Sequence, residues 1–347
     1  MTYRIPLAPD QWTSKEQHAV LSVLFNGRYT MGEKVRELES LWAAQVRARH
    51  AIMVSSGSAA LELAAFWYAE KIGIETSVVM PAVTWPTTAW PFIRAGFKVR
   101  FADIDPETLQ MNIEPSGFGH VLVRLMGNVG NSPPNGTIIE DNCEAVTPLS
   151  GHLACYSTFF SHHLSTVEGG FVCTDNDEIA DWMRSARAHG WARDRENVPE
   201  SDIDRRFLFL EQGWNFKPMD LTAAAGVSLM PRFAMSNQKR IGQFKAMKEV
   251  LPKWLKPMTL EKECVPFAFP MISPNKAKRI VLQERLENMG IETRPIAGGN
   301  LTKQPAFQKH KERWWAGDLP GADHIHDCAI FCSLTDDIGY FAEAVDI

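Results

Sequence analysis

The sequence predicts an α/β protein, in which a sheet carries helices on its faces and a second, smaller domain follows. Two observations predict this class. Short apolar runs alternate with helix-like stretches along the first half of the chain, as in a sheet covered by helices. The chain also has 347 residues, more than the roughly 250–300 at which a single core stops growing, so two unequal domains are expected.

The first half supplies the expected sheet elements in order. Residues 50–56 read as a strand and residues 57–73 as the helix after it. Residues 77–83 form the next strand, followed by a helix over 84–96 whose first turn suits Pro86. Five short β-rich runs follow, at residues 98–105, 120–127, 136–142, 153–160 and 169–175. A helix at residues 177–191 closes this stretch.

The second half predicts a bridge and a small domain. A helical pattern over residues 229–255 leads out of the sheet domain. An apolar run at 265–272, a helix near 277–290 and the segment 291–299 follow. We therefore predict a large domain of residues 1–244 and a small C-terminal domain of residues 245–347.

Composition favours an ordinary globular protein, which we expect in the cytoplasm. The net charge of −5 lacks the basic footprint of a nucleic-acid-binding protein. No apolar run is long enough to span a membrane, and the N-terminal stretch lacks the apolar core of a signal peptide. Six scattered cysteines without a CxxC pair favour reduced, buried thiols over a metal or iron–sulfur site. His324 and His326, at strand spacing and with no third ligand nearby, are interpreted as structural, so no metal is predicted.

A phosphate site is expected where the strand at 50–56 meets the helix at 57–73. Gly57 leaves free N–H groups at the positive end of the helix dipole, and Ser58 adds a hydroxyl. The alternative is a serine that only caps the helix, and for this motif taken alone the alternative is the better interpretation.

Two further side chains at strand ends suit a flat, cationic ring. Trp85 follows the strand at 77–83, where an indole can lie on an aromatic ring, although tryptophan is also common in cores. Asp141 follows an apolar strand and is either a strand-end cap or the partner of a buried cation. A protonated pyridine nitrogen is such a cation, and the carboxylate would hold its proton. Together these motifs predict a phosphorylated, pyridine-type cofactor.

With "STFFSHHLSTVEGG" at residues 157–170, these motifs resemble the DegT/StrS family of pyridoxal-phosphate-dependent sugar enzymes in order and spacing. The resemblance implies the fold of the aspartate aminotransferases (fold type I), with a large mixed-sheet domain and a small C-terminal α+β domain. It also implies a homodimer with shared active sites. The stretches "RAHGWAR", "GWNFKPMD" and "GIETRPIAGGN" are similar to the sugar 3-dehydratase branch of the family.

The resemblance assigns roles in binding the cofactor and the substrate. Arg294 would meet the substrate or the carboxylate of the co-substrate, and His189 is interpreted as a loop or substrate-contact residue rather than a second base. The cofactor contacts implied by the resemblance are the phosphate ligands Gly57, Ser58 and Ser157, the stacking Trp85, the ring-nitrogen partner Asp141, Glu144 near the ring face or hydroxyl, and Asn215 from the other subunit.

One position departs from most of the family. A lysine usually stands six residues before the glutamate of "EGG", and here that position is His162. A lysine amine joins the cofactor aldehyde covalently, whereas an imidazole cannot, so the cofactor would enter the reaction untethered, as pyridoxamine 5′-phosphate. An imidazole, with an ordinary pKa near ~6.5, suits proton abstraction at neutral pH. We predict His162 as the catalytic base and expect His163 to point away, because adjacent side chains alternate on a strand.

The implied reaction removes the C3 hydroxyl of a nucleotide-linked 4-keto-6-deoxyhexose, such as GDP-4-keto-6-deoxymannose. L-Glutamate would then convert pyridoxal 5′-phosphate back to the amine form. Two alternatives stay open: a nucleotide-sugar aminotransferase that lacks the internal lysine, and a non-catalytic ligand-binding homologue. The retained Asp141, Trp85 and Ser157 disfavour the second of these.

Overall fold

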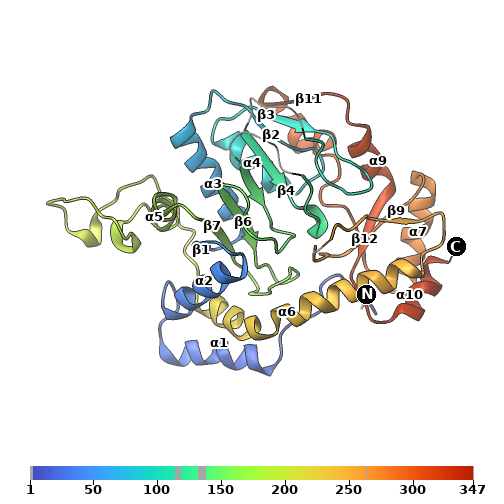
Figure 1. Ribbon diagram of the computed structural model, residues 1–347, viewed down its shortest axis with the longest axis horizontal. Helices are drawn as coiled ribbons and strands as arrows, with labels where there is room; N and C mark the ends of the chain where they lie inside the picture. The colour runs from blue at the N-terminus through green and yellow to red at the C-terminus, as the bar shows by residue number, and fades with distance from the viewer. Residues whose placement is uncertain (1–2, 114–118, 132–137, 263, 347) are drawn as a thin grey trace.

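The structure is a computed structural model that describes residues 3–113, 119–131, 138–262 and 264–346. Its larger part is built on a mixed sheet with the strand order β1-β7-β6-β5-β4-β2-β3-β11 (Figure 1). Strands β6, β5, β4, β2, β3 and β11 run parallel, and β7 lies antiparallel between β6 and β1. The strands of this sheet are β1 His50–Val54, β2 Val78–Pro81, β3 Val99–Ala102, β4 Gly119–Val123, β5 Ile138–Asp141, β6 Leu153–Ser157, β7 Gly170–Thr174 and β11 Trp314–Ala316.

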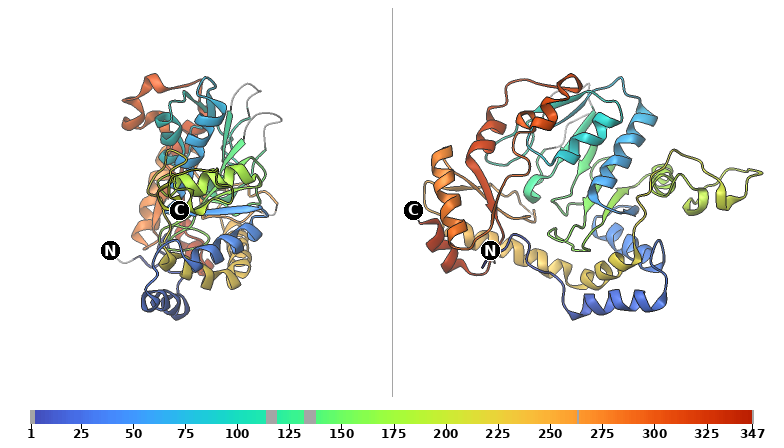
Figure 2. Two further views of the ribbon diagram at one scale, coloured as in Figure 1. Left: turned by 90° about the vertical axis from the view of Figure 1, so that its left-hand side faces the viewer. Right: turned by 180° about the vertical axis from the view of Figure 1, so that it is seen from behind.

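The strands are apolar almost throughout because helices cover both faces of the sheet. Ile52 and Val54 point into one core with α3 and α4, whereas Met53 between them points into a second core with α2 and α6. Figure 2 gives the same layers from the side and from behind. The helices of this part are α1 Ser14–Asn26, α2 Glu33–Gln45, α3 Gly57–Ile72, α4 Pro86–Arg94, α5 Asp177–Ala186 and α6 Asp220–Glu249.

A second, antiparallel sheet with the order β10-β12-β9-β8 forms the small C-terminal domain. Helix α6 joins the two parts: it packs on α1 and α2 at one end and on α10 at the other (Figures 1 and 2). The elements after α6 are β8 Lys256–Pro257, β9 Phe269–Ile272, α7 Lys276–Asn288, β10 Thr293–Pro295, α8 Pro305–Gln308, α9 Pro320–Cys328, β12 Ala329–Cys332 and α10 Ile338–Val345. The 3₁₀ helices are η1 Leu125–Gly127, η2 Ala192–Asp194, η3 Arg205–Phe207, η4 Leu301–Lys303 and η5 Lys311–Arg313.

The predicted fold class is confirmed: a large mixed sheet with helices on its faces precedes a small α+β unit. Residues 136–137 of one predicted strand lie outside the described residues, and the remainder of that strand is β5. The boundary at residue 245 stays a prediction; it falls inside α6, and β11 returns from the C-terminal part to the edge of the large sheet.

Several details differ from the sequence expectation. The helix predicted at 229–255 is α6, which already begins at Asp220 and ends at Glu249. The strand predicted at 120–127 ends at Val123, and residues 125–127 form η1. The apolar run at 265–272 becomes a strand only at Phe269, because the residues before it cross to the large domain. His324 and His326 lie on helix α9, so their interpretation as residues at strand spacing was wrong.

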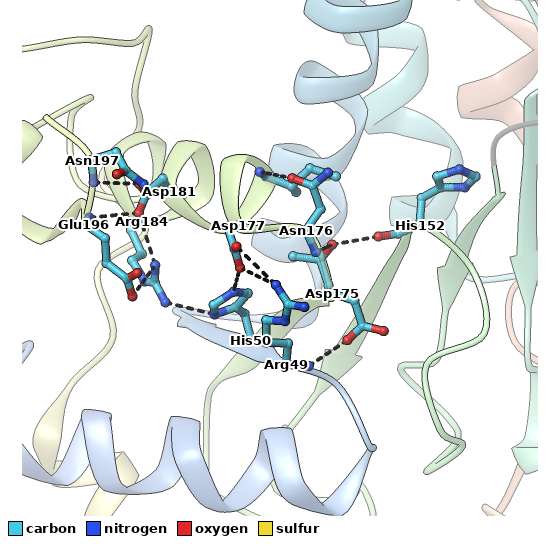
Figure 3. Close-up of polar contacts among 12 residues, drawn as sticks. Arg49, His50, His152, Asp175, Asn176, Asp177, Asp181, Arg184, Glu196 and Asn197 are labelled. Atoms are coloured by element: carbon cyan, nitrogen blue, oxygen red, sulfur yellow. Dashed lines mark hydrogen bonds and ion pairs between the residues drawn. The ribbon is translucent and has the colours of Figure 1, made fainter. Parts of the chain in front are cut away.

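An arm, residues 190–213, projects from the body between α5 and α6 (Figures 1 and 2). At its base Gly190 and Gly213 approach so closely that a Cβ on Gly213 would lie 2.0 Å from the Gly190 nitrogen. A polar network ties the arm to the body (Figure 3): the Asp181 carboxylate accepts hydrogen bonds from the backbone N–H groups of Glu196 and Asn197, each at 2.9 Å.

All six cysteines are free thiols. No helix in the described ranges has both the length and the apolar character needed to cross a bilayer.

Candidate active site

The tight junction between β1 and α3 is fixed by glycine. Gly57 begins α3, and a Cβ on it would lie 2.7 Å from Cβ of Ser157 and 2.8 Å from Sγ of Cys143. Such distances are too short for any side chain, so Gly57 lets the helix N-terminus come against the end of β6. The structure therefore brings together two of the predicted phosphate contacts, Gly57 and Ser157.

The N-terminus of α3 matches the expected anion site. Ser56 caps the helix, with its hydroxyl accepting a hydrogen bond from the Ala59 N–H at 3.0 Å. A serine does cap the helix, as the alternative interpretation expected, but the capping residue is Ser56, which leaves Ser58 free of that role. Ser58 instead exchanges a hydrogen bond with the Thr87 hydroxyl at 2.8 Å, and its exposed Oγ lies beside the positive end of a helix of 16 residues.

Asp141 lies at the end of β5 as a buried carboxylate with uncharged partners. The Thr88 hydroxyl donates to Oδ2 at 2.6 Å, and the Cys143 N–H donates to Oδ1 at 3.1 Å. Burial raises the pKa of Asp141, against the lowering effect of these hydrogen bonds. A cation placed against this carboxylate would offset the penalty of burying its charge, as a protonated pyridine nitrogen does.

Trp85 presents an exposed indole at the start of α4, the helix that carries Thr88. It is the N-cap residue of α4, with Pro86 in the first turn as predicted, and its side chain is 59% exposed. The Thr88 N–H donates to the Trp85 carbonyl at 3.0 Å, and the Thr88 hydroxyl donates to Asp141, so one residue links the backbone of Trp85 to the buried carboxylate. A large exposed aromatic side chain on the same turn as this threonine is suited to stacking on a flat ring.

Glu144 follows Asp141 by three residues and is also removed from water. Burial raises its pKa to about 7, and the nearby Asp141 acts in the same direction. The Met126 N–H donates to Oε2 at 2.9 Å, and Met126 adopts a left-handed backbone with φ of 55°. Near neutral pH this carboxyl group can therefore hold or release a proton.

The two histidines lie in a closed loop between β6 and β7. Hydrogen bonds from Thr158 N–H to the Gly169 carbonyl and from Thr166 N–H to the Thr158 carbonyl, at 2.9 and 2.8 Å, close this loop. Because residues 158–169 are not a strand, the expected alternation does not apply. Both imidazoles contact one ring, Phe267, at centroid distances of 5.1 Å for His162 and 5.9 Å for His163.

The environments of the two histidines nevertheless differ. His163 is buried, and its Nε2 donates to the Val265 carbonyl at 3.3 Å. Nδ1 of His162 is buried and has no hydrogen-bond partner in the described part of the chain. Burial lowers the pKa of His162 to about 4, and the positive charge of Arg240 lowers it further, while backbone groups of Cys143 and Ser157 oppose this. His162 is therefore neutral at physiological pH and able to accept a proton.

His189 and Asn215 form a separate group at the base of the arm. They are joined by Lys217, whose Nζ donates to His189 Nε2 at 2.7 Å and to the Asn215 side-chain oxygen. The neighbouring Phe216 carbonyl accepts from the Ser55 N–H at 3.0 Å, so this group borders the β1–α3 junction.

Arg294 lies farther out, on β10 of the small sheet. Its guanidinium pairs with Glu292 at 2.9 Å and is 59% exposed. The loop that follows β10 does reach the site: the Leu301 N–H donates to the Ala82 carbonyl at 2.8 Å and the Gly298 N–H to the Thr84 carbonyl at 3.3 Å. No described hydrogen bond joins Arg294 itself to the other predicted site residues.

Four residues of this region were not predicted from the sequence: Thr88, Lys217, Arg240 and Phe267. Thr88 and Lys217 stand two or three residues from predicted ones, so their neighbourhood was a usable signal. Arg240 and Phe267 are far along the chain and gave none. Across the described residues, no group of three or more side chains is suited to hold a metal, and His326 instead accepts from the Asn300 N–H at 3.3 Å.

Comparison with known proteins identifies strong similarities over the whole chain. The model of the DegT/DnrJ/EryC1/StrS aminotransferase family matches residues 10–116 and 137–339. The GDP-4-keto-6-deoxy-D-mannose 3-dehydratase of Escherichia coli O55:H7 is 31% identical, over 98% of this chain and 99% of that protein.

Solved structures agree. The E. coli GDP-4-keto-6-deoxy-D-mannose-3-dehydratase with bound hydrated pyridoxal phosphate matches with a TM-score of 0.90 and 29% identity, covering 100% of both chains. A GDP-4-keto-6-deoxymannose-3-dehydratase with a trapped pyridoxal phosphate–glutamate geminal diamine matches with a TM-score of 0.89 and 28% identity, covering 99% of this chain and 100% of the other.

Proposed function

The chain belongs to the DegT/DnrJ/EryC1/StrS aminotransferase family, and we propose that it is a pyridoxal-phosphate-dependent nucleotide-sugar 3-dehydratase. Its substrate is a nucleotide-linked 4-keto-6-deoxy sugar, by analogy with the dehydratases it is similar to. The observation that carries the proposal is His162: a partly buried, neutral imidazole stands beside the cofactor seat, in sequence register with the lysine of most family members.

The residues of the site fit the cofactor. Gly57 leaves the space that a side chain would fill, and Asp141 is a buried carboxylate whose described partners are uncharged. We assign the phosphate to the N-terminus of α3 with Ser58 and Ser157, the ring to Trp85, and the ring nitrogen to Asp141. When bound, the protonated ring supplies an electron sink for the carbon atoms joined to it.

His162 performs the proton transfers in this proposal. Its neutral imidazole accepts a proton at a ring nitrogen and returns it to the departing C3 oxygen of the sugar. Glu144, whose pKa is raised to about 7, can hold a second proton near the ring at neutral pH. Because histidine cannot form the covalent bond that lysine makes with the aldehyde, noncovalent contacts alone hold the cofactor.

L-Glutamate is the proposed co-substrate that restores the amine form, as the glutamate adduct of the related structure suggests. We assign Arg294 to a carboxylate or phosphate of a bound molecule, because an exposed guanidinium is suited to either group. His189, paired with Lys217, is assigned to the substrate.

We further propose that the enzyme is a homodimer acting in the cytoplasm, without nucleic-acid or membrane partners. The arm carries Ile203, Phe207 and Phe209 with side chains more than half exposed, which is typical of a surface that meets a partner. If a second copy packed against the arm, Asn215 at the base of the arm would approach the cofactor phosphate bound by that second copy.

Mass spectrometry of the sugar product tests the proposed function. The protein is incubated with GDP-4-keto-6-deoxymannose, pyridoxamine phosphate and glutamate. The expected products are a keto sugar that has lost the C3 oxygen, together with ammonia and 2-oxoglutarate. A 4-amino sugar that keeps its C3 hydroxyl would identify an aminotransferase instead, and the absence of turnover would favour a non-catalytic homologue.

A further inference from the structure

A short segment of the C-terminal part crosses to the base of the candidate site. This strap, residues 265–267, ends one residue before β9 and contacts η1, the turn that follows β4. The approach is close: a Cβ on Gly127 would lie 2.1 Å from the Val265 carbonyl oxygen. The Phe267 N–H donates to the Met126 carbonyl at 3.0 Å, so the strap is fastened to the large domain through its backbone.

Helix α6 holds the strap from its other side. Nη1 of Arg240 donates to the Phe267 carbonyl at 2.8 Å. The backbone of Phe267 is therefore hydrogen bonded on both its N–H and its carbonyl, to two different elements. The backbone from which its side chain projects is thereby fixed, and the Phe267 ring meets the His162 imidazole edge-to-face at an interplanar angle of 85°.

A catalytic imidazole commonly gives one nitrogen to a carboxylate or carbonyl, which fixes its orientation and tautomer. Backbone hydrogen bonds with Cys143 and Ser157 act on the His162 ring and raise its pKa against the effect of burial, while Nδ1 is buried without a hydrogen bond of standard geometry in the described ranges. The ring also contacts two aromatic side chains edge-to-face, Phe159 at 5.8 Å and Phe267 at 5.1 Å between centroids.

The same strap also reaches the second titratable group of the site. The Met126 carbonyl accepts from Phe267, and the Met126 N–H donates to the Glu144 carboxylate at 2.9 Å. Phe267 therefore contacts the proposed base, His162, through its ring and is connected to Glu144 through the backbone of Met126.

We propose that Phe267 is a positioning residue, which holds the His162 imidazole in its reactive orientation by aromatic packing, in addition to the backbone contacts of the ring. The inference rests on the proposed function, in which His162 is the base. Because the strap belongs to the C-terminal part and is held by α6, docking of that part on the large sheet sets the orientation of the base. Phe267 acts through His162 and needs no contact with the substrate.

The test compares Phe267→Leu with two matched variants. Phe267→Tyr keeps the ring. Phe331→Leu makes the same substitution at a partly buried position of the same small sheet, which contacts neither histidine in the described structure. Steady-state kinetics should show kcat lowered by about 10- to 100-fold in Phe267→Leu, since small misplacements of a reacting group have effects of that order. The KM for the sugar should stay within about twofold, while Phe267→Tyr and Phe331→Leu keep kcat near the wild-type value.

A second readout does not depend on turnover. Nuclear magnetic resonance of histidine-labelled protein, with His162 assigned from the His162→Asn spectrum, reports the titration of this ring in each variant. In Phe267→Leu the His162 titration should move from about 4 toward the ordinary 6.5, because water enters beside the ring. The other two variants should leave it unchanged.

Loss of kcat in Phe331→Leu equal to that in Phe267→Leu would overturn the inference, because the effect would then be one of general stability. So would a His162 signal that Phe267→Leu does not move. If the wild-type protein shows no dehydratase activity, the proposed function fails, but the resonance measurement still decides whether Phe267 holds His162.

Discussion

The molecule contains two histidine clusters that differ in how their charges are satisfied. In the first, His50 Nε2 donates to Asp177 at 2.7 Å, while Arg184 donates to its Nδ1 at 3.3 Å and Arg49 also pairs with Asp177 (Figure 3). In the second, His162 is partly buried, and its buried Nδ1 has no hydrogen-bond partner in the described residues. Both ring nitrogens of His50 are therefore hydrogen bonded, whereas Nδ1 of His162 remains without a partner in the described residues and can take part in proton transfer.

The difference lies in desolvation. Asp177 lies at the surface, where hydrogen bonds from His50 and Arg49 lower its pKa. The side chains of His50 and Arg49 are thus already engaged by this carboxylate. His162 is partly buried, and no carboxylate is among the groups that set its pKa, which burial lowers to about 4. A polar network whose groups are all hydrogen bonded stabilises a surface, whereas a buried ring nitrogen without a hydrogen-bond partner indicates a site that a ligand completes.

The largest expected effect is that of His162→Asn. Removing the base should lower kcat by about 10²- to 10⁴-fold, the usual contribution of general acid–base catalysis. Binding of pyridoxamine phosphate, followed by its absorbance in equilibrium dialysis, should change little. His163→Asn is the matched control and should be much milder, because its Nε2 is engaged by the Val265 carbonyl. The reverse ranking would assign the base to His163.

A second large effect is expected for Asp141→Asn. The amide cannot hold a proton on the ring nitrogen, so kcat should fall by about 10²-fold, comparable with loss of one electrostatic partner in other enzymes. Thr88→Val removes only the hydroxyl that donates to Asp141 and should have a smaller effect in the same kinetic assay. Equal activity of Asp141→Asn and the wild type would exclude the ring-nitrogen contact.

The free energy of unfolding should depend on pH through His162, and this dependence should be absent from His162→Asn. The unfolded chain binds a proton at His162 below about 6.5, whereas the folded chain binds one only near 4. The wild type should therefore lose stability as the pH falls from about 6.5 to about 4, by at most about 3 kcal/mol, and His162→Asn should not lose this part. Glu144, whose raised pKa acts with the opposite sign, contributes to both proteins and cancels. Urea unfolding curves at pH 7 and pH 5 measure the difference; identical pH dependence in both proteins would contradict the lowered pKa of His162.

The smallest effect is expected for His50→Asn. This change removes one hydrogen bond to Asp177, whose side chain is 59% exposed, and polar contacts of exposed carboxylates contribute little to stability. The urea midpoint should move less than in His162→Asn, and kcat should stay unchanged. A marked loss of activity would show that the surface cluster also serves the site.

The sequence predicted those features that lie at strand ends. Gly57, Trp85 and Asp141 each follow an apolar run by one to four residues, and parallel strands bring their carboxyl ends to one edge. The strands themselves were found because both faces of the sheet are covered, which makes each one continuously apolar.

Features that depend on tertiary approach could not be predicted. The strap and Arg240 reach His162 from about 80 to 100 residues along the chain, with no motif to mark them. The alternation expected for His162 and His163 was wrong because hydrogen bonds of Thr158 and Thr166 close a loop where a continued strand was expected. Asn215 was assigned through resemblance, and its proposed role requires a second subunit.

The most direct measurement concerns the bond that His162 cannot make. The protein loaded with one equivalent of pyridoxal phosphate is reduced with borohydride, digested, and its peptides are weighed. All lysine peptides should remain unmodified, and the cofactor should be recovered free. One equivalent of cofactor fixed to a lysine, for example Lys217 beside Asn215, would show a tethered ring and contradict the account.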